Sequence, residues 1–132
     1  MREHSDTRSN SKMETMWTWP TAPSSGRIMK EEFKAAYELF LKEWGQEAQE
    51  RMAIEEMSEL IKELCKKIRF NRDKFENVPN EKIEDNIGHI KEEIADVLNM
   101  AEQLEIFYGT EEIEKIRSEK IQRTLNLLKE VE

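Results

Sequence analysis

Acidic residues recur in two short groups whose spacing suits a metal site. Glu56 and Glu59 lie three residues apart. Glu93 and Asp96 repeat that spacing further along the chain. In an α-helix, residues at this spacing lie about 60° apart and one turn along the same side. Each pair adjoins an apolar stripe, so two such helices packed antiparallel are expected to bring the four carboxylates together across their seam.

Four carboxylates in one place repel one another unless protons or a cation neutralise them. Two unit charges about 5 Å apart cost roughly 3 kcal/mol at an effective dielectric near 20. An all-oxygen group poor in histidine suits Mg²⁺ or Mn²⁺ rather than Zn²⁺. Magnesium held by few carboxylates keeps waters and completes its shell with substrate phosphates. The chemistry implied is hydrolysis of a phosphate ester or anhydride by metal-activated water.

The acidity of the whole chain offers an alternative explanation for the two acidic pairs. Among 132 residues, 29 are acidic and 21 basic, for a formal net charge of −8, so these spacings also arise by chance on a solvated helix face. In that case the protein is a non-catalytic helical interaction or adaptor protein. A carboxylate-bridged di-iron bundle needs two Glu-x-x-His motifs, which His4 and His89 do not supply. The acidic balance also argues against nucleic-acid binding.

Four stretches have the apolar period of an amphipathic helix. Helices are predicted at residues 30–44, 46–69, 81–107 and 111–130. Gly45 and Gly109 separate neighbouring helices, and Asn80 is predicted to cap the third. The fold class expected is all-α, a bundle of about four helices. The second and third helices exceed 30 Å at 1.5 Å per residue, so one subunit covers them poorly and a homodimer or homotetramer is expected.

Residues 1–29 form a polar tail without helical period, and residues 30–132 form the helical domain. Trp17 and Trp19 in the tail are expected to dock on the domain or on a partner chain, in preference to closing over a base pocket. No apolar run approaches the length of a membrane span. The lone Cys65 is expected in the core and suits a reducing compartment. We therefore expect a cytoplasmic protein without a membrane partner.

The run WGQEAQERMAIEEMSEL at Trp44–Leu60, with KEEIADVL at Lys91–Leu98, resembles the MazG-like all-α nucleoside triphosphate pyrophosphohydrolases. Their signature is EExxE on one helix and ExxD on the next. The resemblance covers about residues 31–128, and the connection between the halves is longer than the family commonly shows. It implies Mg²⁺-dependent cleavage of a nucleoside triphosphate to the monophosphate and pyrophosphate, in the cleaning of nucleotide pools.

The resemblance also implies roles for the acidic residues. Carried over position by position, the residues that hold the metals are Glu56, Glu59, Glu93 and Asp96. Glu55 completes the EExxE motif and would support a metal ligand or orient the attacking water. Glu55 and Glu56 are therefore the candidate catalytic residues.

Four residues outside the motif are candidates for substrate contacts. Lys120 falls near the centre of the apolar side of the last helix, so its ammonium needs an anion, unless it snorkels to solvent. A triphosphate would supply this anion, as would an acidic side chain across a dimer interface. Arg123 adjoins Lys120 on the same helix. The amides of Gln49 and Asn99 suit a base or sugar. The ring of Trp44 could stack on a base, but Trp44 extends the stripe of the first helix, so core packing is expected for it.

Overall fold

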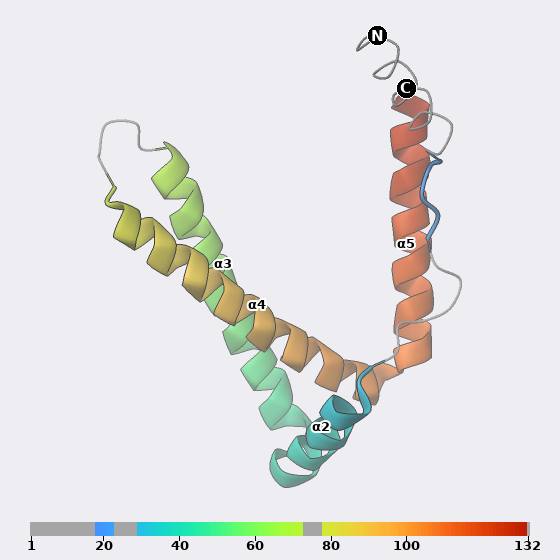
Figure 1. Ribbon diagram of the computed structural model, residues 1–132. Helices are drawn as coiled ribbons and strands as arrows, with labels where there is room; N and C mark the ends of the chain where they lie inside the picture. The colour runs from blue at the N-terminus through green and yellow to red at the C-terminus, as the bar shows by residue number, and fades with distance from the viewer. Residues whose placement is uncertain (1–17, 23–28, 73–77, 132) are drawn as a thin grey trace, which may run out of the picture. The chain divides into compact units, whose positions relative to one another are not determined.

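The computed structural model describes residues 18–22, 29–72 and 78–131. In these residues there are four helices and no strand. The helices are α2 (Glu31–Trp44), α3 (Gln46–Arg72), α4 (Asn80–Tyr108) and α5 (Thr110–Val131) (Figure 1). The all-α class and the four predicted helices are confirmed, with ends that agree to within three residues.

Two glycines end helices because they adopt positive φ, which other residues reach only with strain. The φ angle is 86° at Gly45 and 105° at Gly109. The backbone N–H of each donates to the carbonyl four residues earlier, which closes α2 and α4 respectively. The start of α4 differs from expectation. Asn80 is the first helical residue, Pro79 holds the N-cap position, and no side chain caps the helix.

The chain divides into two units, one of residues 27–113 and one of residues 1–26 with 114–132. In the first unit, α3 and α4 lie side by side and run in opposite directions, and α2 contacts both (Figure 1). This antiparallel seam is the arrangement that the two acidic pairs require. In the second unit, the backbone N–H of Ala22 donates to Gln122 Oε1 at 3.1 Å, which ties part of the tail to α5. Trp17 lies outside the described residues.

The described residues bury few apolar side chains. Those buried are Tyr37, Ala53 and Met100. On α3, three isoleucines at a spacing of seven stay largely exposed: Ile54, Ile61 and Ile68, at 66%, 61% and 53%. Cys65, on the same helix, is also exposed, so its expected place in the core is wrong. Within the unit of residues 27–113, the long apolar stripe of α3 is therefore left uncovered by α2 and α4.

The uncovered apolar residues do not make any helix suited to a bilayer. No helix in the described ranges has the length and apolar content needed to cross a membrane. The exposed stripes are narrow bands on otherwise polar helices, which is the pattern of surfaces that pack on other helices.

Candidate metal centre

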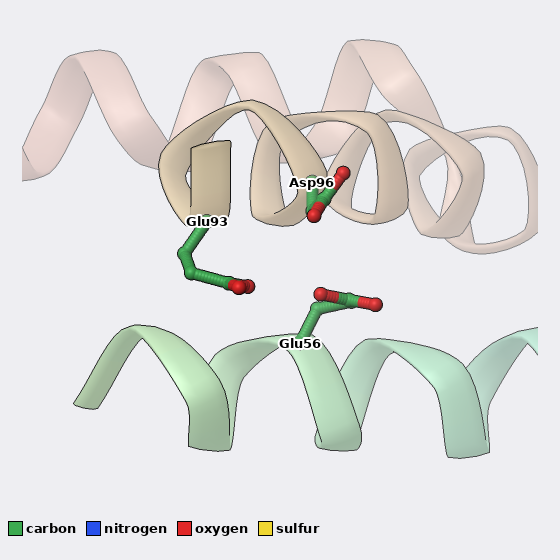
Figure 2. A group of neighbouring side chains, drawn as sticks. All are labelled: Glu56, Glu93 and Asp96. Carbon is green, nitrogen blue, oxygen red and sulfur yellow. The ribbon is translucent and has the colours of Figure 1, made fainter. Parts of the chain in front are cut away.

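Three carboxylates converge between α3 and α4. Glu56 projects from α3, and Glu93 and Asp96 project toward it from one turn of α4 (Figure 2). Each residue offers one oxygen, and these oxygens all lie within 4.8 Å of one another. Glu56 and Glu93 are half-buried, and Asp96 is exposed. Three of the four residues expected to face one another across the seam thus do so.

The fourth predicted ligand is not part of this group. Glu59 is exposed on α3, one turn beyond Glu56. Because Glu56 already adjoins the apolar stripe, a further turn rotates the next carboxylate away from the seam. Glu55 is exposed as well, but its charge reaches the site and helps to raise the pKa of Glu56.

The group is electrostatically strained without a cation. Partial burial raises the pKa of Glu56 to about 7, helped by a hydrogen bond with Glu93 and then by the negative charge of Asp96. Oε2 of Glu93 is buried and has no hydrogen-bond partner. A buried polar atom without a partner is costly, and a bound cation would satisfy it.

The donor set fits Mg²⁺ or Mn²⁺. All three ligands are carboxylate oxygens, the type that these hard cations prefer, and no imidazole or thiolate belongs to the group. Oxygens that share a cation at about 2.1 Å lie at most about 4.2 Å apart. Small side-chain rotations would bring this group into that range. Glu56, Glu93 and Asp96 are therefore the residues that would hold the metal.

The raised pKa of Glu56 predicts opposite effects of pH on the metal-free and metal-bound protein. Between about pH 4.5 and 7 the folded carboxyl keeps a proton that the unfolded chain has lost, so the stability of the metal-free protein falls as pH rises through this window. A cation needs the ionised form. Mg²⁺ affinity is therefore expected to fall below about pH 7, by up to about tenfold per pH unit.

Thermal unfolding with and without Mg²⁺ at about pH 6 and about pH 8 measures both effects. The rise in Tm caused by Mg²⁺ is expected to be larger at the higher pH. An equal rise at both values would show that Glu56 does not ionise on binding.

A cavity of about 520 Å³ adjoins the acidic group, and Glu56 and Asp96 form part of its lining. Trp44 forms another part and stacks on Phe40, with ring centroids 5.4 Å apart and planes at 30°. Trp44 is 62% exposed, so the expectation that it packs in the core is wrong. The stacked pair instead gives the cavity a flat aromatic wall beside the carboxylates.

Amide side chains line the same cavity. Gln49 is buried, and its Nε2 donates to Gln103 Oε1 at 2.6 Å. Asn99 is exposed, and its Oδ1 accepts from the Tyr37 hydroxyl at 2.9 Å. Two predicted substrate contacts, Gln49 and Asn99, therefore share a cavity with the acidic group. Sequence reasoning missed Gln103, which also lines the cavity. The available signal for Gln103 was its position one turn beyond Asn99 on the same side of α4.

The two predicted basic contacts lie on α5. Lys120 and Arg123 are exposed there, in the unit that α5 forms with the N-terminal residues. The carbonyl of Lys120 accepts from the Thr124 hydroxyl at 3.1 Å, a bond within the helix. This arrangement does not test whether Lys120 and Arg123 contact a phosphate. Both contacts stay predictions.

Comparisons of the chain with protein-family models, with curated proteins and with solved structures found no match. The resemblance to MazG-like pyrophosphohydrolases therefore stays a prediction from the two acidic motifs. The functional proposal depends on the acidic group and on the cavity beside it.

Proposed function

We propose that the protein is a Mg²⁺-dependent, MazG-like nucleoside triphosphate pyrophosphohydrolase that removes unwanted nucleotides in the cytoplasm. The observation that carries the proposal is the convergence of three carboxylates, two of which line a cavity with an aromatic wall and amide groups. A nucleotide needs both parts. Its phosphates need a cation, and its base needs a flat surface with hydrogen-bonding groups.

At the phosphate end, Glu56, Glu93 and Asp96 would hold the cation, and Glu59, which lies outside this group, stays a prediction as a ligand. When bound there, Mg²⁺ would supply neutralisation of the phosphate charge and a lowered pKa of water. The oxygen of a water molecule bonds to the α-phosphorus, the bond from that phosphorus to the oxygen bridging to the β-phosphate breaks, and pyrophosphate leaves. Glu55, beside the group, orients the water and accepts its proton.

At the other end, the cavity holds the base and sugar. Its volume of about 520 Å³ lies within the range of about 300–1,000 Å³ that small-molecule sites occupy. The base stacks on Trp44, and Gln49 and Asn99 supply hydrogen bonds to the base or sugar. Lys120 and Arg123 bind phosphate oxygens in this proposal.

A panel of nucleoside and deoxynucleoside triphosphates tests the proposal. We expect pyrophosphate and the monophosphate as the products of one or a few of them in the presence of Mg²⁺, and no product with a chelator. A folded protein that turns over no nucleotide in the panel would contradict the proposal and favour the non-catalytic adaptor.

We also propose that the active form is a homodimer or homotetramer. Support comes from the exposed isoleucines of α3, because stable interfaces bury roughly 1,200–2,000 Å² and apolar stripes supply such area. Ile61→Glu is expected to shift the protein to the monomer in analytical ultracentrifugation. Lys62→Glu, a charge change at the neighbouring exposed position, is the control and should leave the assembly intact. A monomeric wild-type protein would contradict this proposal.

A further inference from the structure

A second cavity, of about 340 Å³, lies between α3 and α4 and does not include the acidic group. We call it the basic pocket. Its polar lining residues are Lys66, Arg69, Lys82, Asp85, Asn86 and His89. Three of these lining residues are cations and one is an anion, in a chain whose net charge is −8. A cluster of cationic side chains in an otherwise acidic protein favours the binding of an anion.

Asn86 gives the basic pocket a second distinctive feature. Its side chain is 1% exposed, and Nδ2 donates to two oxygens of Glu63, the backbone carbonyl at 3.1 Å and Oε2 at 2.8 Å. Both partners are acceptors, so the amide orientation is fixed. Oδ1 of Asn86 is buried and has no hydrogen-bond partner. A buried acceptor without a donor is costly, and a hydrogen-bond donor that reached Oδ1 would relieve that cost.

The charges around Asn86 divide into two groups. Lys66 forms an ion pair with Glu63 at 3.5 Å, and the Asn86 hydrogen bond holds the pKa of Glu63 below its usual value, so that carboxylate stays charged. Lys66 is thereby partly neutralised within the protein. Arg69 and Lys82 are exposed residues of the lining, one from each helix. Their positions allow both to approach an anion, and guanidinium is suited to phosphate.

We propose that the basic pocket binds a small phosphate monoester that carries a hydroxyl group. The phosphate pairs with Arg69 and Lys82, with Lys66 in support, and the hydroxyl donates to Oδ1 of Asn86. The carboxylate of Asp85 accepts a hydrogen bond from a further hydroxyl of the ligand. Its negative charge disfavours an anion that has no hydroxyl group. The volume suits a sugar phosphate or a molecule of similar size.

A nucleic-acid backbone fits this pocket less well. Three cations in one cavity neutralise few phosphates, and the acidic remainder of the chain would repel a polyanion. The proposal is independent of the pyrophosphohydrolase activity, because none of its residues belongs to the acidic group. Glu63 and Asn86 lie two helical turns from Glu56 and Glu93, about 10 Å along each helix.

Nuclear magnetic resonance titrations of the full-length, ¹⁵N-labelled chain test the proposal. A chelator keeps the acidic group free of metal, and the probes are glycerol 3-phosphate, inorganic phosphate and glycerol. We expect glycerol 3-phosphate to shift the side-chain amide signal of Asn86, with a Kd at least about tenfold below that of inorganic phosphate. Glycerol alone should cause no shift at that signal.

Paired variants separate the pocket from general electrostatics. Arg69→Gln with Lys82→Gln is expected to weaken glycerol 3-phosphate binding at least about tenfold. The control is Arg51→Gln with Lys62→Gln, which removes the same charge from exposed positions of α3 outside the pocket and should bind as the wild type does. Glu56→Gln should also bind normally, which keeps this test separate from the proposed enzymatic function.

Three results would overturn the proposal. The first is the absence of any shift at Asn86 with the phosphorylated probe. The second is equal weakening in the pocket variant and its control, which would reduce the effect to long-range attraction. The third is equal affinity for inorganic phosphate and glycerol 3-phosphate, which would remove the hydroxyl contact with Asn86.

Discussion

Replacing Glu56 by Gln, or Asp96 by Asn, is expected to lower kcat/KM for pyrophosphate release by about a thousandfold or more. Each change removes a negative charge from the converging carboxylates and keeps the side-chain size nearly constant. The loss should appear at every Mg²⁺ concentration, because the remaining carboxylates cannot position the cation against the α-phosphate. Initial rates on the preferred nucleotide, with Mg²⁺ varied, measure it.

The same variants should fold normally and be more stable than the metal-free wild type. Burial and the neighbouring acids raise the pKa of Glu56, which reflects a cost that the amide avoids. Glu92→Gln is a matched control, since Glu92 is an exposed neighbour on α4 outside the group. It should keep full activity. Full activity in Glu56→Gln would mean that the metal ligands are wrongly assigned.

Asn86→Ala is expected to lower the free energy of unfolding by about 2–4 kcal/mol near pH 7. The substitution removes both hydrogen bonds to Glu63, a carboxylate that is only 8% exposed. The Asn86 bond is the main cause of the lowered pKa of Glu63. Its contribution is therefore present above about pH 4.5 and is lost as pH falls below that value.

Urea denaturation of the wild type and Asn86→Ala at about pH 7 and about pH 3 checks both the size and the pH dependence. The difference between the two proteins should shrink in acid. Asn71→Ala, at an exposed position of α3, is the control and should change stability by less than about 0.5 kcal/mol. A pH-independent difference would indicate that packing, and not the bond to Glu63, accounts for the loss.

Much of the fold could be predicted because it is local. The 3.6-residue period of apolar residues predicts the helices. Gly45 and Gly109 end α2 and α4, because their positive φ angles are incompatible with a continuing helix. The same angular reasoning placed Glu56 and Glu93 at the edge of their stripes, which is why their convergence could be expected before the structure was known.

The remaining features depend on how α3 crosses α4, which periodicity does not encode. Asn86 looks like any surface amide in the sequence, yet it is buried because Glu63 of the other helix meets it there. The exposure of Trp44 likewise follows from what α2 packs against, and no local pattern reports that.

The exposed indole of Trp44 gives the molecule an intrinsic optical reporter. A tryptophan in contact with water emits at longer wavelength than a buried one, and an occupant stacked on its ring would quench and blue-shift that fluorescence. With Trp17 and Trp19 replaced by phenylalanine, the remaining emission would come from this one ring, since the chain has three tryptophans. Filling of the cavity could then be followed in real time without a label.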